Sequence, residues 1–139
     1  MKTRQSSQGF TLIELVIAMA IAAIVATIAY ASYSTQIQHG RRSDALTSVG
    51  SISSSLERCY AQAYAYTSCT NAAAGITASQ NGYYSIATTV AASTYTVTAT
   101  PVGGQAGDTS CAVIALSNSG QSATNSQGVD ATKTCWGSS

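Results

Sequence analysis

The sequence predicts an α+β protein in which one long N-terminal α-helix packs on a small antiparallel β-sheet, with a C-terminal region closed by disulfides. Three observations carry this prediction: an apolar run that passes into an amphipathic stripe, a series of alternating β-branched segments, and four cysteines placed after the apolar run. A helix followed by strands grouped together is an order typical of α+β domains.

The first element is an apolar stretch over residues 10 to 33, in which Glu14 is the only charged side chain. A helix of about 20 residues spans a bilayer, so this stretch is long enough. The nine residues ahead of it carry Lys2 and Arg4, which the positive-inside tendency places on the cytoplasmic side. An acidic side chain at membrane depth usually has a partner and a function, so Glu14 needs a positively charged partner.

The junction between Gly9 and Phe10 is a candidate cleavage site. A secretory signal carries its cleavage site after the apolar core, whereas this junction precedes the apolar run. A cut here would leave the hydrophobic segment on the mature protein. It would also create a new α-amine at Phe10, four residues from Glu14.

These residues resemble the N-terminal signature of type IV pilins and the related pseudopilins. The match comprises a basic leader, Gly9, Phe10, Thr11 and the glutamate at position 14, followed by an apolar helix. The resemblance implies that a prepilin peptidase cuts after Gly9 and methylates Phe10. It also implies that Glu14, with Thr11 beside the new terminus, serves assembly by pairing with the Phe10 ammonium of a neighbouring subunit. Such a pair is strong in a low-dielectric site, where either charge alone is penalised.

The resemblance also implies a pilin fold and three segments: a cytoplasmic leader over residues 1 to 9, a transmembrane or filament-core helix over 10 to 33, and a periplasmic or extracellular domain over 34 to 139. It implies a structural filament subunit for adhesion, twitching motility or DNA uptake, not an enzyme. Its partners would be other pilin subunits, the prepilin peptidase, an inner-membrane assembly platform, the inner membrane before assembly, and DNA or a host surface. Two alternatives stay open: a type II secretion pseudopilin, and a membrane-anchored binding module that never polymerises.

The helix continues beyond the membrane segment to about residue 64. Gly40 interrupts it and is the place where we expect a bend, because glycine is unfavourable inside a helix. Apolar residues then recur at intervals of three and four, one stripe of an amphipathic helix: Ala45, Val49, Ile52, Leu56, Cys59 and Ala63.

Resembling pilins often carry a glycine and a proline inside the membrane helix, and this chain departs from them. The matching positions hold Ala23 and Ala31. Glycine and proline cost about 1 and 3 kcal/mol in a helix interior, so this sequence has lost that bias toward melting. We expect residues 12 to 36 to stay helical in the monomer and mostly so in a filament.

Strand signals follow an expected loop over residues 67 to 82. Three segments, which begin at Tyr83, Ser93 and Cys111, are rich in β-branched or aromatic residues and are bounded by turn residues. In the second, one face holds Tyr95, Val97 and Ala99 while threonines occupy the other, which predicts one dry and one wet face. Residues 121 to 139 are expected to form a glycine- and serine-rich tail.

The four cysteines predict two disulfides, because an even count lies on the non-cytoplasmic side. Four cysteines allow three connectivities. Closeness in sequence favours Cys59 with Cys69 and Cys111 with Cys135. A zinc site is disfavoured because no Cys-x-x-Cys motif occurs and the one histidine is distant in sequence.

Other chemistry has weaker support, and we expect no catalytic residue, cofactor or metal. A triad through His39 is disfavoured because that residue belongs to the helix, far in sequence from the acidic residues of the sheet region. Calcium binding by Asp108 and Asp130 lacks the usual run of acidic ligands. Arg41 and Arg42 are candidates for lipid headgroups or DNA, although a solvated helix face or a subunit contact is the more ordinary role. A surface stripe or packing beneath the loop are the alternatives for five tyrosines: Tyr60, Tyr64, Tyr66, Tyr83 and Tyr84.

Overall fold

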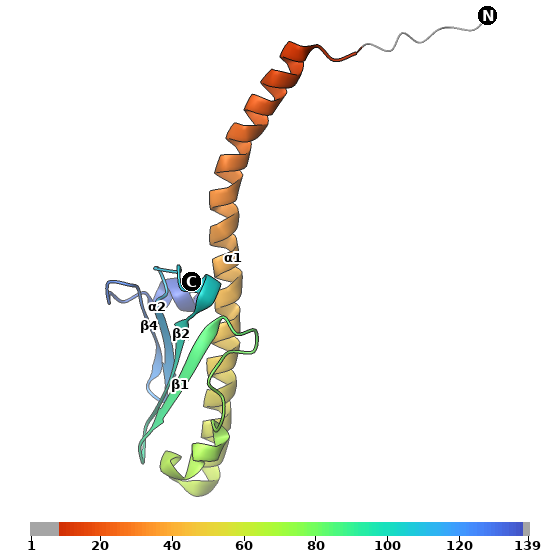
Figure 1. Cartoon of the computed structure of the whole chain (residues 1–139). Coiled ribbons are helices and arrows are strands. Elements are labelled where there is room, and N and C mark those ends of the chain that lie inside the picture. Colours follow the sequence, from red (N-terminus) through yellow and green to blue (C-terminus); the bar gives the residue numbers. More distant parts are fainter. Residues whose placement is uncertain (1–8, 138–139) are drawn as a thin grey trace, which may run out of the picture. The chain divides into compact units, whose positions relative to one another are not determined.

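The computed structural model describes residues 9 to 137. Lys2 and Arg4, in the expected leader, lie outside the described residues. The described chain runs from α1 through the strands β1 to β4 to the short helix α2 (Figure 1). It divides between Ile37 and Gln38 into two compact units.

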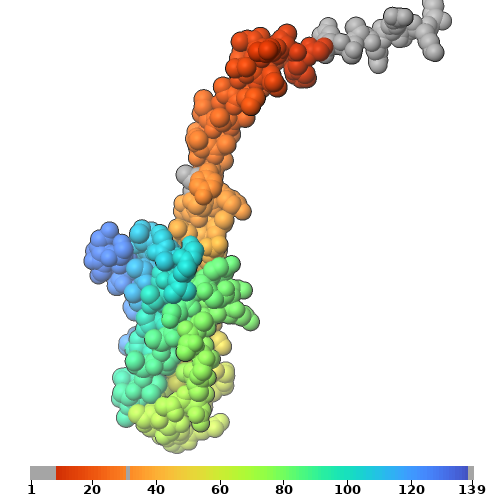
Figure 2. Space-filling model, viewed as in Figure 1, coloured from red at the N-terminus to blue at the C-terminus, as the bar shows by residue number. Residues whose placement is uncertain are grey.

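The first unit is the N-terminal half of α1, the helix Leu12–Ala63. The helix is unbroken over residues 12 to 36, which confirms the expectation drawn from the alanines at positions 23 and 31. By length and composition it can cross a membrane, since its most apolar window has a mean hydropathy of 2.6. Residues 10 to 30, red to orange in Figure 2, present a bare apolar surface.

The second unit packs the C-terminal half of α1 on the sheet. Of the expected stripe, Ala45, Val49, Ile52 and Leu56 are buried in the core, whereas Cys59 is half-buried and Ala63 is exposed. The stripe therefore predicted the packing face correctly, except at the last turn of the helix.

The sheet is an antiparallel meander in the order β1-β2-β3-β4. Tyr95, Val97 and Ala99 are buried, and the threonines between them lie on the opposite face, as the alternation predicted. The strands are β1 (Tyr84–Val90), β2 (Tyr95–Pro101), β3 (Val113–Ser117) and β4 (Gly120–Thr124). The 3-10 helix Gly103–Gln105 lies between β2 and β3.

Two segments expected to be irregular have regular structure. The tail expected over residues 121 to 139 contains most of β4 and the helix α2, Thr132–Trp136. The loop expected over residues 67 to 82 begins with most of the 3-10 helix η1, Tyr66–Ala72.

The tail prediction was wrong because β4 has almost no apolar signal. In β4 only Ala123 is buried. The strand is defined by its ladder with β3 and by the tight turn that ends at Gly120, whose φ of 135° suits glycine. Hydrogen bonding to a neighbouring strand, rather than side-chain periodicity, makes this segment a strand.

Candidate functional site

The candidate processing site lies immediately before α1. Gly9, Phe10 and Thr11 precede the first helical residue, and the Phe10 side chain is 84% exposed. The Glu14 backbone N–H donates to Thr11 Oγ1 at 3.3 Å, so Thr11 is the N-cap of the helix. Threonine followed three residues later by glutamate has the spacing of a capping box.

Glu14 occupies the first turn of α1, where the helix dipole favours a negative charge. It is exposed, as are the apolar side chains on every side of it. Among residues 9 to 137 the one ion pair joins Arg42 to Asp108, so Glu14 has no ionic partner within the described chain. The geometry therefore presents a single carboxylate, close to Phe10, on the half of α1 that is apolar on all sides.

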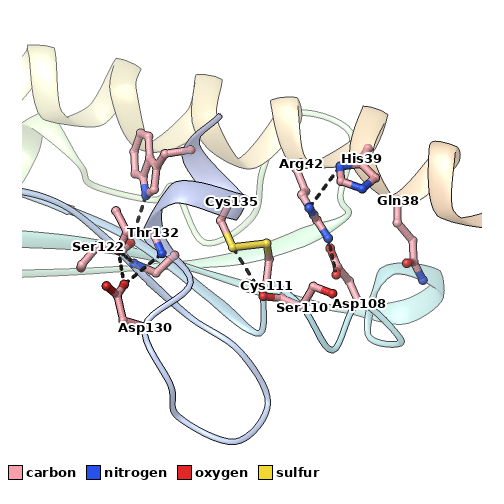
Figure 3. The surroundings of a disulfide bond; sticks show 12 residues. Gln38, His39, Arg42, Asp108, Ser110, Cys111, Ser122, Asp130, Thr132 and Cys135 are labelled. Carbon is pink, nitrogen blue, oxygen red and sulfur yellow. Dashed lines mark hydrogen bonds and ion pairs between the residues drawn. A yellow bond between two sulfur atoms is a disulfide. The ribbon is translucent and has the colours of Figure 1, made fainter. Parts of the chain in front are cut away.

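A buried ion pair joins α1 to the loop between β2 and β3. Arg42 Nε and Nη2 donate to the two carboxylate oxygens of Asp108, each at 2.7 Å. The two side chains are only 6% and 1% exposed. Arg42 Nη1 also lies 3.2 Å from His39 Nδ1 (Figure 3). This bidentate geometry is the strong form of an arginine–carboxylate contact.

Asp108 is held in its charged form. Burial disfavours the carboxylate, but the hydrogen bonds and the charge of Arg42, with backbone N–H groups of Ser110 and Cys111, bring its pKa below the ordinary value. The buried Gln105 Nε2 lies within 3.2 Å of Asp108 Oδ2, the Tyr84 hydroxyl and a backbone carbonyl of α1, so its two N–H groups are shared among three acceptors. The loop after β2 is thereby fixed to the helix.

Arg41 and Arg42 have different roles. The Arg41 guanidinium lies over the Tyr83 ring, 4.5 Å from its centroid, a cation–π contact. Arg42 is buried in its ion pair, so the expectation of a solvated helix face or a subunit contact is wrong for Arg42. A contact of Arg42 with lipid or DNA is excluded by the same burial.

Disulfides join Cys59 to Cys69 and Cys111 to Cys135, the connectivity that the spacing favoured. The second ties the start of the β3 region to α2. The N–H and hydroxyl of Thr132 both donate to Asp130 Oδ1, which fixes the start of α2.

The structure does not bring Asp130 and Asp108 together as cation ligands. In Figure 3 they lie on either side of the second disulfide, Asp108 paired with arginine and Asp130 hydrogen-bonded to Thr132. The charge of each carboxylate is thus already satisfied by contacts within the chain.

The five tyrosines do not form one surface stripe. Tyr66 and Tyr84 are buried, whereas Tyr64 is 80% exposed. Tyr66 stacks on Tyr60 with ring centroids 4.3 Å apart and meets Tyr95 edge-on at 4.9 Å. Burial and the hydrogen bond that Tyr66 donates to Glu57 raise its pKa to about 12.

Sequence reasoning missed the Arg42–Asp108 pair. The partners are 66 residues apart, and no local periodicity connects them. One signal in the sequence could have indicated it. The chain has few charged residues, and an arginine next to the buried stripe needs an acidic partner if it is itself buried.

Comparison with known proteins identifies the family. Residues 31 to 115 match the family model described as type IV minor pilin ComP, DNA uptake sequence receptor. The chain belongs to this type IV minor pilin family. Residues 4 to 30 of the pilin match a second model, the prokaryotic N-terminal methylation motif, and this match includes the Gly9–Phe10 junction and Glu14.

A curated relative agrees with this assignment. The pilin is 35% identical over 99 residues to the fimbrial protein EcpC of Eikenella corrodens. The matched region covers 70% of this chain and 64% of that relative. The chain therefore spans a little under two thirds of the length of the curated protein that it matches.

Proposed function

We propose that this pilin is a structural subunit of a type IV pilus, made as a membrane-anchored precursor and without catalytic activity of its own. In this proposal a prepilin peptidase removes residues 1 to 9 and methylates Phe10. The helix over residues 10 to 33 then passes from the inner membrane into the core of an extracellular filament, through an inner-membrane assembly platform. The domain over residues 34 to 139 forms the filament surface.

The observation that carries this proposal is the N-terminal arrangement. An exposed, non-helical Gly9–Phe10 junction stands directly before the capped helix α1. Up to residue 30 the apolar side chains of this helix are exposed on every side, and its one charge there is Glu14. Bundling such helices removes both apolar surface and Glu14 from water. A buried carboxylate is heavily penalised unless it meets a cation, and the Phe10 ammonium of a neighbouring copy has the required charge.

The intact mass of the protein from sheared, purified surface fibres tests the processing step. We expect a chain that has lost the nine residues from Met1 to Gly9 and gained one methyl group. Fibre subunits that retain Lys2 or Arg4 would contradict it. Gly9→Val should block cleavage and leave an anchored precursor, so normal fibres from that variant would also contradict it.

The assembly step is tested by Glu14→Ala, with Glu57→Gln as the control on the same helix, because glutamine removes the charge and still accepts the hydrogen bond of the Tyr66 hydroxyl. Loss of one partner from a buried pair costs about 3 to 5 kcal/mol, so we expect Glu14→Ala to be processed but to yield few fibres. Glu57→Gln should assemble normally, since Glu57 lies outside the apolar segment. Equal fibre yields from the two variants would show that Glu14 has no special role in assembly.

DNA binding is a second candidate function, favoured by the description of the matched family. The small number of exposed basic side chains limits how strongly the chain can bind DNA. Outside the buried ion pair, the basic side chains between residues 9 and 137 are Arg41, Arg58 and Lys133. Three phosphate contacts would give a slope of log affinity against log salt no steeper than about −2.7.

The salt dependence of the affinity is measured by titrating duplex DNA with the full chain in micelles. The salt concentration is varied between about 50 and 200 mM. Arg58→Gln should reduce the slope by about 0.9 if Arg58 contacts a phosphate. An absence of binding at low salt would reject the receptor role and leave the filament role intact.

A further inference from the structure

The edge strand β1 is left partly unpaired by the described chain. The outer edge of β4, at the other side of the sheet, is paired at its C-terminal end, where the Ala131 N–H donates to the Ala123 carbonyl and the Asn125 N–H, just past the strand, donates to the Val129 carbonyl. The outer edge of β1 is bonded only near its start, where the Ile86 N–H donates to the Thr77 carbonyl at 2.9 Å.

The register shows which groups stay free. Ile86 points its N–H away from β2, and alternation along an antiparallel strand gives Thr88 and Val90 the same outward direction. In this register the N–H and C=O of Thr88 face away from β2, and among residues 9 to 137 they make no hydrogen bond to a residue outside the sheet. The segment from Tyr66 to Thr77 runs alongside this edge and contacts it at both ends. At its other end the Tyr66 N–H donates to the carbonyl of Ala92, just past β1, at 3.1 Å.

Between these two closures lies a hollow of about 380 Å³. One wall is the free edge of β1, and the other is η1 with the loop that follows. No charged side chain lines it, and its lining includes Cys69, Ala73, Ile76, Ile86, Thr88 and Val90. The Cys59–Cys69 disulfide joins η1 to α1, which holds the wall formed by η1 in place.

One buried polar side chain that lines the hollow has no hydrogen-bond partner among the described residues. The Thr88 hydroxyl oxygen is buried and has no hydrogen-bond partner in the described part of the chain. Buried polar atoms are nearly always satisfied in folded proteins, so an unsatisfied one requires an explanation. The backbone and the side chain of the same residue thus both lack partners at the same hollow.

We propose that this hollow, the β1-edge site, binds a short, extended and uncharged peptide segment that pairs with Thr88. Free backbone N–H and C=O groups on a strand edge are the complement of another extended backbone, the mode of recognition known as strand addition. The uncharged lining disfavours acidic or basic side chains and nucleic acid, because a charge placed there would lose water without gaining a partner. The aliphatic side chains of Ile76, Ile86 and Val90 suit a small β-branched residue.

Titration of the full mature chain in detergent micelles tests the proposal. The probe is the blocked peptide acetyl-Thr-Val-Thr-Ala-Thr-amide, followed by amide chemical shifts and hydrogen exchange of the ¹⁵N-labelled protein. We expect saturable shifts at Thr88, Val90 and the η1 segment, with slower exchange of the Thr88 amide. Thr88→Val should weaken binding about tenfold, the effect of one lost hydrogen bond.

Thr89→Val is the matched control, since Thr89 is the next residue of β1 and lies on the opposite, exposed face. It should leave binding unchanged. A second probe, with its central residues N-methylated, should bind at least tenfold more weakly because it cannot pair with the strand edge.

Three results would overturn the proposal: no saturable shift at these amides, equal binding by the N-methylated probe, or equal losses from Thr88→Val and Thr89→Val. Shifts of the same amides that depend on protein concentration without peptide would assign the site to a second copy of the chain instead. Fibre yield is measured in parallel, so a failure here is separate from a failure of the filament role.

Discussion

The two halves of the 52-residue helix α1 differ in where their apolar side chains go. In the first half Leu12 is 81% exposed and Ile28 is 70% exposed, whereas in the second half Val49 and Leu56 are fully buried. The second half is stabilised by burying one face against its own sheet. The first half has no such packing, so lipid or other helices must supply the environment for its apolar surface.

This difference predicts that changes in the second half alter domain stability, while equivalent changes in the first half alter insertion and assembly. The largest effect is expected at the buried ion pair. Arg42→Met leaves Asp108 buried without a partner and should lower the free energy of unfolding by about 3 to 5 kcal/mol. Arg58→Met, at an exposed arginine of the same helix, should change it by less than about 0.5 kcal/mol. Urea unfolding of the chain in micelles measures both.

A double variant, Arg42→Met with Asp108→Leu, should recover most of the loss, because no unpaired charge then remains. If it is as unstable as Arg42→Met alone, packing of the arginine stem rather than charge explains the effect.

The same pair gives a pH dependence of known sign. The pKa of Asp108 lies below its ordinary value in the folded state, so its contribution is present above the unfolded pKa of about 3.9 and is lost as the pH falls through the lowered value. Denaturant midpoints should therefore fall as the pH is lowered below about 4. Asp108→Asn should be less stable at pH 7 and show a shallower decline; an identical decline would assign the acid sensitivity to other carboxylates.

A matched pair of leucines tests the comparison most directly. Leu56→Ala removes a fully buried side chain and should cost about 2 to 5 kcal/mol of domain stability. Leu15→Ala, at a position that is 57% exposed, should leave domain unfolding unchanged and reduce only membrane insertion or fibre yield. Equal losses of domain stability would mean that the two halves of α1 are not independent.

The two disulfides are expected to differ only slightly in how much they stabilise the folded domain. In the loop-entropy model the 24-residue separation of Cys111 and Cys135 contributes about 3.5 kcal/mol, against about 2.7 kcal/mol for the 10-residue separation of Cys59 and Cys69. Reduction should loosen the C-terminal region first, because β4 contributes little apolar surface. Hydrogen exchange after reduction should rise earlier in β4 than in β1; the reverse order would refute this.

Much of the fold was predictable because strong periodic signals coincide with burial. The helix, its packing face, three strands and the disulfide connectivity all follow from spacing along the chain. The strand β4 and the helix α2 were missed because polar residues form them and long-range hydrogen bonds define them, such as the Trp136 indole N–H donating to the Ser122 carbonyl.

The candidate site divides in the same way. Gly9, Phe10, Thr11 and Glu14 were predicted because they lie within one short stretch that resembles the pilin N-terminal signature. Their roles in processing and assembly stay predictions, and the structure adds that Thr11 caps the helix. The Arg42–Asp108 pair was missed because nothing local relates two residues so far apart. A bend at Gly40 and the behaviour of the helix between Ala23 and Ala31 in a filament stay predictions.

The smallest effect is expected where α1 ends. Tyr64 follows the last helical residue and adopts a left-handed conformation with φ of 57°, while its side chain is 80% exposed. Glycine is the usual residue at such a position because it lacks the Cβ that strains this conformation. Tyr64→Gly should therefore stabilise the domain by about 0.5 to 1 kcal/mol, even though it removes a large side chain. Ala63→Gly, at the last helical residue, should destabilise it by up to the roughly 1 kcal/mol that glycine costs in a helix interior. Unfolding of the two variants under one condition gives opposite signs if backbone strain dominates at the helix end. A loss of stability from Tyr64→Gly as large as that from Ala63→Gly would show that the tyrosine ring contributes more by contact than its conformation costs.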